Sequence, residues 1–402
     1  MTDASTLPLA GLRILDLSTM IAAPVASTFL ADFGAEVYKV ELPGGGDGMR
    51  DLAPHKDGEP LWWKVTNRNK KAITLDVRTP EGRDLLLRIL PKFDVLVENF
   101  RPGTLERYGL DCETLQSVNP TLIILRVSGY GQTGPLAQQP GFARIAEAYS
   151  GLTYICGEPD TAPMHLGYPI ADAVTGQFGA IGILIACYRK LTHPDAPGEI
   201  VDVSLVESTF RLLEFLPIEY DQLGEVRERS GNRSQYAGPS NVYRSRDGHW
   251  ISMSASAQRV FERLAEMIGR PDLIIDDRFA TNAARVRNAE TLDTYISAWF
   301  ADRDASDILE TLARSHVSGG KVNSIADIFE SEQMRAREAI VYAEDEALGP
   351  VAMSNVVPRM VRAPGAVRTS GPSRGRHSEE FWTGFAGLNP AHFEELRQKQ
   401  VI

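Results

Sequence analysis

The chain has 402 residues, of which 43% are hydrophobic and 24% are charged, so its composition is that of a folded protein and its length predicts two domains. The formal net charge of −11 argues against nucleic acid or an anionic membrane surface as a partner. A small anionic ligand stays compatible with this charge, because a few local arginine and lysine side chains suffice to bind it.

Strands and helices alternate in the first third of the chain. Short apolar runs predict strands at residues 13–17, 36–42, 72–77, 94–98 and 122–127. Between them the pattern predicts helices at residues 24–33, 79–90 and 111–118. This alternation is typical of a parallel, doubly wound sheet, in which ligands bind beyond the carboxyl ends of the strands. The loops expected at those ends are residues 18–23, 43–48, 99–103 and 128–134.

The rest of the chain first continues this pattern and then departs from it. Before a polar, charged segment at residues 224–237, the pattern predicts a helix, a strand and a helix, at residues 173–188, 198–204 and up to about Tyr220. Beyond it we expect a smaller α+β domain with strands and helices at residues 242–244, 250–253, 256–268, 289–301 and 304–315. Finally, we expect an irregular, proline-containing segment and a charged helix, at residues 351–372 and 390–400.

Several features favour a cytoplasmic location. The first residues, Met-Thr-Asp-Ala-Ser, lack the basic region and apolar core of a signal peptide. The most apolar run, residues 173–188, falls short of the roughly 18 residues of a membrane span. The cysteines at positions 112, 156 and 187 are widely spaced and suggest neither a disulfide framework nor a zinc site. We therefore expect no membrane association and no metal.

One stretch, residues 159–189, combines an isolated carboxylate with regularly spaced glycines. Asp172 is the only formally charged residue between Asp160 and Arg189. Gly176, Gly179 and Gly182 follow at intervals of three, which predicts a helix face without side chains and a close approach by a backbone or a ligand. Asp172 reads either as the N-cap of this helix or as a nucleophile that the helix N-terminus keeps ionised.

Several common catalytic motifs do not occur. The segment after the first strand, residues 17–24, contains no glycine and so lacks the dinucleotide-binding pattern. Residues 44–48 are rich in glycine but do not have the spacing of a phosphate-binding P-loop. No nucleophile elbow of a serine hydrolase is present. NAD, ATP and serine-hydrolase chemistry are therefore not indicated.

Basic residues nevertheless gather near the predicted strand ends. Singly each reads as a solvated surface charge, but together they could form a cradle for phosphate groups. They are Arg68, Lys70, Lys71, Arg78, Arg101 and Arg107. Aromatic residues near them could stack on a ring or pack in the core; they are Trp62, Trp63, Phe100 and Tyr130.

Taken in order, these segments resemble the class III CoA-transferase family, the group of formyl-CoA transferase, carnitine-CoA transferase and the bile-acid-inducible proteins. The resemblance covers about the first 210 residues and weakens in the small domain, with a further motif at residues 375–379. Its motifs are GLRILDLS at residues 11–18, ADFGAEVYKVE at 31–41, NKKAITLDVRTPEG at 69–82, DVLVENFRPG at 94–103, SGYGQTGP at 128–135, PIAD at 169–172 and VDVSLVE at 201–207.

The resemblance implies a Rossmann-like α/β large domain formed by both chain ends, residues 1–222 completed by 335–402, with a small α+β domain at 223–334. It also implies an interlocked homodimer and no permanently bound cofactor. CoA and acyl-CoA would be substrates, and Asp172 would be the nucleophile that forms an aspartyl intermediate. By motif position, the implied CoA contacts are Ile21, Ala22, Leu75, Arg78, Asn99, Phe100, Arg101 and Arg107.

The chain departs from the family pattern at three places. Gln139-Pro140 stand where the family has a CoA-binding lysine, and the glycine loop of formyl-CoA transferases is not seen near residues 230–239. Phe142 stands where related α-methylacyl-CoA racemases carry a histidine base, so a two-base proton exchange lacks one partner. A CoA-transferase is therefore the first expectation. A racemase or isomerase of the same superfamily and a non-catalytic CoA-binding protein are the alternatives.

Two further residues bear on the acceptor acid. Arg144 and His165 could meet a second carboxylate, so a dicarboxylate such as succinate is one possible acceptor. Both side chains could equally be structural. The sequence names neither the acyl donor nor the acceptor.

Overall fold

The computed structural model describes residues 6–402, and the chain divides into two compact units. The first unit contains the chain up to Leu152, then Leu166–Pro217 and Ala336–Ile402. The second contains Thr153–His165 and Ile218–Arg335. Both ends of the chain therefore build the first unit, and Asp172 belongs to it together with the residues from Leu166 onward.

A parallel sheet of six strands forms the centre of the first unit, and each of its strands was predicted. The order across the sheet is β5-β2-β1-β6-β7-β8. The strands are β1 (Arg13–Asp16), β2 (Glu36–Glu41), β5 (Lys71–Thr74), β6 (Val95–Glu98), β7 (Ile123–Ser128) and β8 (Ile200–Ser204). Ile14 lies opposite Val37 of β2 on one side and Val95 of β6 on the other.

The strand order reverses between β1 and β6. The chain builds the sheet outward from β1 through β2 to β5, and then returns to place β6 on the other side of β1. The loops that follow β1 and β6 consequently diverge at this point, which in doubly wound sheets is where ligands bind. We therefore expect a ligand site at the loops after Asp16 and after Glu98.

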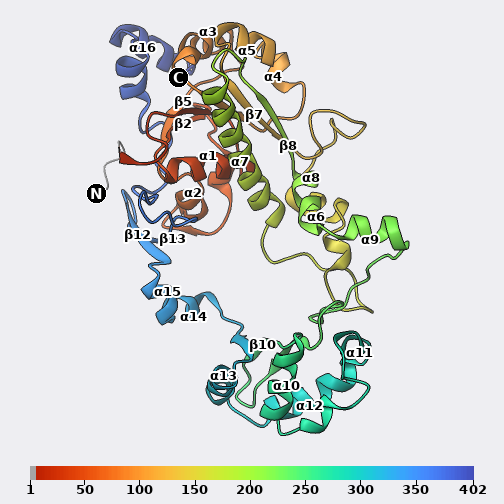
Figure 1. Ribbon diagram of the computed structural model, residues 1–402. Helices are drawn as coiled ribbons and strands as arrows, with labels where there is room; N and C mark the ends of the chain where they lie inside the picture. Colours follow the sequence, from red (N-terminus) through yellow and green to blue (C-terminus); the bar gives the residue numbers. More distant parts are fainter. Residues whose placement is uncertain (1–5) are drawn as a thin grey trace. The chain divides into compact units, whose positions relative to one another are not determined.

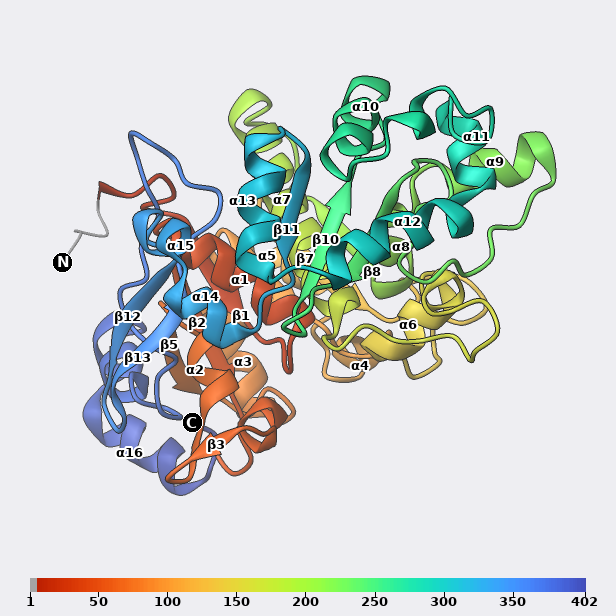
Figure 2. The ribbon, with the colours of Figure 1, turned by 90° about the horizontal axis from the view of Figure 1, so that it is seen from below.

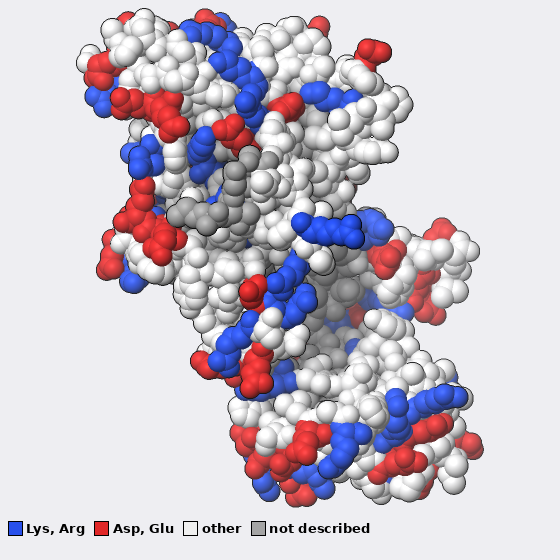
Figure 3. All heavy atoms as spheres, turned by 60° about the vertical axis from the view of Figure 1, so that its left-hand side comes forward, with Lys and Arg blue, Asp and Glu red and all other residues white. Residues whose placement is uncertain are grey.

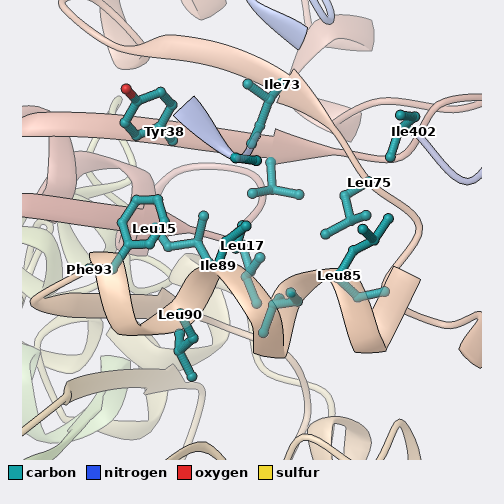
Figure 4. Close-up of a cluster of buried hydrophobic side chains, with 14 of the residues drawn as sticks. Leu15, Leu17, Tyr38, Ile73, Leu75, Leu85, Ile89, Leu90, Phe93 and Ile402 are labelled. Atoms are coloured by element: carbon teal, nitrogen blue, oxygen red, sulfur yellow. The ribbon is translucent and has the colours of Figure 1, made fainter. Parts of the chain in front are cut away.

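Both faces of the sheet are covered, which explains the nearly continuous apolar runs of its strands. On one face, Ile14, Val97 and Leu125 pack with helices α1 (Ala22–Asp32) and α7 (Ile170–Thr192). On the other, Leu15, Tyr38 and Ile73 pack against α3 (Pro80–Ile89), as Figure 4 shows. The C-terminal residue Ile402 is part of the same cluster.

The glycines of α7 let neighbouring elements approach it closely. A Cβ atom on Gly176 would lie 2.7 Å from the Ala22 carbonyl oxygen and 2.6 Å from Val25 Cγ1 of α1. On Gly182 it would lie 2.6 Å from Val201 of β8. The predicted close approach is therefore made by α1 and β8 of the same chain. Helices α1 and α7 run side by side in Figure 1.

Helix α7 is also the one helix among residues 6–402 that is long and apolar enough to cross a membrane by length and composition. Buried core helices meet the same criterion. The packing of α7 against α1, β7 and β8 accounts for part of its apolar composition, since 44% of its most apolar window is buried.

The C-terminal segment returns to the first strands of the chain. The Asp76 N–H donates to the Val401 carbonyl (2.7 Å), and the Thr74 N–H donates to Ser378 Oγ (2.9 Å). Figures 1 and 2 both show this blue segment beside the red and orange N-terminal strands. The expectation of an irregular segment at residues 351–372 was partly wrong, because β13 (Gly349–Ser354) pairs with β12 (Ile340–Asp345) in an antiparallel hairpin.

The helix predicted to run to about Tyr220 is interrupted. Helix α8 (Leu205–Phe210) is followed by a short turn, and α9 (Leu216–Leu223) begins after Glu214, whose φ of 35° breaks helical geometry. The other elements of the first unit are β3 (His55–Lys56), β4 (Glu59–Pro60), α2 (Leu61–Thr66), α4 (Thr104–Arg107), α5 (Cys112–Val118), α6 (Ala143–Tyr149) and α16 (Pro390–Gln398).

The second unit has its own core around a small antiparallel sheet of order β11-β10-β9. Tyr243, Ile251 and Phe261 are fully or almost fully buried in that core. Its strands are β9 (Ser240–Arg244), β10 (Trp250–Ser254) and β11 (Ser318–Lys321). Its further helices are α10 (Gln258–Met267), α11 (Asn282–Arg287), α12 (Ala289–Ala301), α13 (Ala305–Arg314), α14 (Ile325–Glu330) and α15 (Glu332–Ala336).

Candidate active site

A cavity of about 420 Å³ lies at the carboxyl ends of the central strands and contains Asp172. Its walls come from the loops after β1, β6 and β7, from the start of α6 and from α7. The lining includes Thr19, Met20, Ile21, Ala22, Asn99, Phe100, Arg101, Gly129, Gly141, Phe142, Arg144 and Asp172. A larger cavity of about 520 Å³ includes Gly11, Glu36 and Lys71 at the strands' amino ends, but neither Asp172 nor any of the implied CoA contacts.

Asp172 is not the N-cap of its helix. The cap position is Pro169, so Asp172 is the third residue of the first turn. Its carboxylate makes no hydrogen bond or ion pair with the described part of the chain, residues 6–402. Burial and the nearby Glu147 carboxylate raise the pKa of Asp172 to about 7. The structure does not support the expectation that helix N–H groups keep this carboxylate ionised, because burial and a like charge favour its protonated form.

Glu147 is a buried acidic residue that sequence reasoning missed. It lies on α6 and is only 1% exposed. Its Oε1 accepts a hydrogen bond from the Ala171 N–H (3.4 Å), which ties α6 to the first turn of α7. This contact places a second carboxylate close to Asp172. The sequence did not predict the short helix α6, so it gave no indication that Glu147 lies there.

The loop after β1 is held in an unusual backbone conformation at the cavity wall. Met20 has a φ of 67°, a left-handed geometry that costs energy for a residue with a side chain. The Thr19 N–H donates to Asn99 Oδ1 (2.8 Å), and Asn99 Nδ2 donates to the Thr19 carbonyl (2.7 Å). The Met20 N–H donates to Asp47 Oδ1 (2.9 Å). Asn99, predicted as a CoA contact, thus also clamps the loop that presents Ile21 and Ala22.

Buried charges beneath this loop support the clamp. Lys39 Nζ lies 3.1 Å from Asp47 Oδ2 and 3.9 Å from Asp16 Oδ1, and all three side chains are at most 1% exposed. Lys70 Nζ donates to Asp16 Oδ2 (3.0 Å). Although burial alone raises the pKa of Asp16, the Lys70 and Lys39 ammonium groups hold it well below its usual range. In the sequence, the charged residues Asp16 and Lys39 inside otherwise apolar strands indicate that buried ion pairs should be expected there.

A smaller cavity of about 170 Å³ adjoins the first, and Thr19 and Phe100 line both. It also contains Leu75 and Arg78, two further predicted CoA contacts. Arg78 forms a bidentate pair with Asp76, at 2.8 and 2.7 Å. Of the predicted CoA contacts only Arg107 lines neither cavity; it donates to Thr104 Oγ1 (2.9 Å).

The predicted phosphate cradle is not assembled as a whole. Arg68 pairs with Asp32 (2.6 Å) and Lys70 with Asp16, both in buried positions. Lys71 begins β5, at the amino end of the sheet, and pairs with Glu36. Arg68 and Lys70 are structural, because buried charges need partners, and Lys71 lies at the end of the sheet away from the Asp172 cavity. Arg78 and Arg101 remain at the two cavities.

The far wall of the Asp172 cavity depends on two glycines that pack directly on each other. A Cβ atom on Gly129 would lie 2.8 Å from Gly141 Cα. Phe142 follows and is 68% exposed. No histidine is among the described residues that line the cavity.

Comparison with known proteins identifies the group to which this architecture belongs. Residues 9–378 match the model of CoA-transferase family III. The succinyl-CoA–D-citramalate CoA-transferase of Chloroflexus aurantiacus is 41% identical over 396 residues, 98% of each chain. The succinate–glutarate CoA-transferase of Agrobacterium fabrum is 34% identical and covers 93% of this chain and 94% of its own.

Solved structures agree with the sequence comparison. A CAIB/BAIF family protein from Brucella suis superposes with a TM-score of 0.83 at 30% sequence identity, covering 93% of this chain and 98% of its own. The family match extends over nearly the whole chain, including the second unit, where the sequence motifs were weak. The protein belongs to CoA-transferase family III and is an acyl-CoA:carboxylate CoA-transferase.

Proposed function

We propose that the protein moves CoA from an acyl-CoA thioester to a free carboxylic acid through covalent intermediates on Asp172. The observation that supports this most directly is the position of Asp172: a carboxylate without a hydrogen-bond partner among residues 6–402, in a cavity at the switch point of the sheet. A carboxylate used to cap, pair or stabilise the fold would have such partners.

The reaction divides into two pairs of acyl transfers. An Asp172 carboxylate oxygen attacks the thioester carbonyl carbon, the C–S bond breaks, and CoA leaves as thiolate from a mixed anhydride. The thiolate attacks the aspartyl carbonyl and releases the donor acid as carboxylate, which leaves an aspartyl-CoA thioester. The acceptor carboxylate attacks this thioester to form a new anhydride and thiolate. Attack of the thiolate on the acceptor's acyl carbon yields the new acyl-CoA and restores Asp172.

The two adjoining cavities support a binding mode in which different parts of CoA occupy each cavity. In this proposal the thioester end lies with Asp172 in the larger cavity, beside Ile21, Ala22 and Asn99. The remainder of CoA extends past Phe100 toward Leu75 and Arg78 in the smaller one. We propose that backbone N–H groups of the loops that line this cavity, among them those of Gly129 and Gly141, stabilise the developing oxyanion.

The names of relatives support a dicarboxylate as the substrate class. Proteins with which this chain aligns over 93% or more of its length act on succinyl-CoA with citramalate or malate, and on succinate with glutarate. We therefore propose a donor that is the CoA half-thioester of a dicarboxylic acid, with a second dicarboxylate as acceptor.

We also propose that the protein is a cytoplasmic homodimer. Helix α7 carries a stripe of exposed apolar side chains at helical spacing, which is unfavourable on a free surface and is typical of an interface. The stripe consists of Ile181, Ile185, Tyr188 and Leu191, which are 48–79% exposed.

A panel of donors and acceptors tests the function. Purified protein is incubated with succinyl-CoA, acetyl-CoA or butyryl-CoA and with malate, glutarate or acetate, and acyl-CoA products are identified by mass spectrometry. We expect new acyl-CoA from succinyl-CoA with a dicarboxylate, and none from the Asp172→Asn variant. α-Proton exchange with solvent in the absence of any acceptor would instead support a racemase. CoA binding without transfer for any pair would contradict the proposal.

A further inference from the structure

The cavity around Asp172 contains two arginines with free guanidinium groups. Arg101 follows β6 and Arg144 lies on α6, and both side chains are exposed. Neither guanidinium makes a hydrogen bond or an ion pair with residues 6–402. Arg78 at the smaller cavity differs, because Asp76 occupies its guanidinium. An anion entering the Asp172 cavity therefore meets two cations that have no other partner among residues 6–402.

The two arginines lie on different walls. Arg101 directly follows Phe100, and Phe100 also lines the smaller cavity, toward which the body of CoA extends in the proposed function. Arg144 belongs to the wall formed by residues 137–144, none of which lines the smaller cavity. In the proposed function, the part of the lining that includes Arg144 is therefore left for the acyl group.

Arg144 has a fixed relation to Asp172. Helix α6 packs on α7, and the hydrogen bond from the Ala171 N–H to Glu147 joins the two helices one residue from Asp172. Arg144 is three residues before Glu147, one helical turn away along α6. A group bound by Arg144 is therefore positioned relative to the nucleophile by a packed helix rather than by a flexible loop.

We propose that Arg144 binds the distal carboxylate of the acyl group and selects dicarboxylic substrates. A guanidinium binds a carboxylate with two parallel hydrogen bonds, a geometry that fixes both distance and orientation. The cavity already contains Asp172 and has Glu147 behind it, so a further carboxylate without a cationic partner would be repelled. Arg144 supplies that partner.

This assignment rests on the proposed function and adds a consequence for both substrates. Because the donor acyl group and the acceptor acid react in turn at the same Asp172, each occupies the same cavity. One arginine then selects both, so donor and acceptor each carry a second carboxylate at a similar distance from the reacting one.

Substitution of Arg144 by methionine tests the assignment. Succinyl-CoA is compared with butyryl-CoA, which has the same chain length but lacks the distal carboxylate, each with glutarate and with butyrate as acceptor. For Arg144→Met we expect kcat/KM for succinyl-CoA to fall roughly 10- to 100-fold, the size of a lost charge-assisted hydrogen bond, while that for butyryl-CoA stays the same or rises. Arg144→Lys should retain an intermediate preference for succinyl-CoA.

Arg101→Met is the matched control, since it removes an arginine from a different segment of the same cavity's lining. We expect it to affect succinyl-CoA and butyryl-CoA equally. If the wild-type protein transfers CoA but Arg144→Met keeps the wild-type preference for succinyl-CoA, with unchanged thermal unfolding, the role of Arg144 is refuted and the proposed function stands. If the wild-type protein transfers CoA for no pair, both are refuted.

Discussion

Asp172 and Glu147 form a pair of carboxylates in which one is exposed to the cavity and the other is buried behind it. Burial first, and the Glu147 charge second, raise the pKa of Asp172 to about 7. A carboxyl group with this pKa is largely protonated in the free protein below neutral pH. As a nucleophile it must be ionised, so its activity is coupled to pH in a range where ordinary carboxylates are not.

The pH dependence of the reaction follows from this coupling. We expect kcat/KM for acyl-CoA to rise with pH, with a midpoint near 7 and a plateau above, because only ionised Asp172 attacks. Glu147→Gln removes the like charge and should move the midpoint to lower pH. Asp160→Asn, at an exposed position, should leave it in place. A rate profile flat between pH 5 and 8 in the wild-type protein would contradict the assignment.

Lys39 is the centre of the buried charges that hold the loop after β1. In Lys39→Met we expect a loss of about 3–5 kcal/mol in the free energy of unfolding, because Asp47 and Asp16 lose a buried partner. The KM for acyl-CoA should also rise, since Met20 depends on Asp47 for its position. Denaturant unfolding and steady-state kinetics measure the two effects.

Lys71→Met provides the control for Lys39→Met. Lys71 and its partner Glu36 are each about one-third exposed, so their pair should contribute no more than about 1 kcal/mol. Equal losses of stability in the two variants would show that the buried network has no special role.

At the level of elements, the contact between α7 and α1 sets the position of Asp172 relative to Ala22. Gly176→Ala would place a methyl group within 3 Å of α1, so the helices must separate or the side chains must shift. We expect a loss of about 1–3 kcal/mol in stability, as in other overpacked cores, together with reduced kcat. Thermal unfolding and the transfer assay measure both.

Gly384→Ala is the matched control for Gly176→Ala. Gly384 also lies in a helical turn, within residues 380–385, but a Cβ atom there would meet nothing within 4 Å. This variant should be as stable as the wild-type protein and fully active. A Gly176→Ala variant that behaved in the same way would contradict the close contact between α1 and α7.

The sequence was sufficient to predict the elements whose apolar pattern is local. The six strands of the parallel sheet and helices such as α3, α7 and α12 were predicted because each has a recognisable apolar pattern in its own sequence. Helix α6 and the hairpin of β12 and β13 were missed, since short or proline-flanked segments acquire their structure from neighbours.

The same distinction applies to the site. Asp172 stood out as an isolated charge in an apolar run, and motif resemblance indicated the loops around Ile21, Asn99 and Leu75. The partners of Asn99, Lys39 and Glu147 could not be predicted, because they join residues distant in sequence. For the same reason Arg68 and Lys70 were misread as ligand-binding charges.

Over the whole molecule, surface charge and surface hydrophobicity are distributed differently. On the face drawn in Figure 3, acidic and basic side chains are interspersed. Exposed apolar residues occur in several segments, and on α7 they form a stripe that includes Ile181, Ile185 and Tyr188. A stripe of this kind is consistent with burial by a second copy of the chain.

Analytical ultracentrifugation tests the proposed dimer. The wild-type protein should sediment as a dimer at micromolar concentration, and Ile185→Arg, which places a charge in the stripe, should shift it toward monomer. Ile275→Arg, at an apolar residue that is 84% exposed outside the stripe, is the control and should remain dimeric. Two monomeric variants would indicate a general effect of added charge, and a monomeric wild-type protein would refute the dimer.

In the proposed reaction, the carboxylate of Asp172 becomes acylated during transfer. Hydroxylamine added to the protein with succinyl-CoA converts an aspartyl anhydride or thioester to a stable hydroxamate, which peptide mass spectrometry locates. We expect a hydroxamate on Asp172, dependent on succinyl-CoA and absent when CoA or succinate replaces it. Active transfer with unmodified Asp172, or a hydroxamate at another carboxylate, would contradict it.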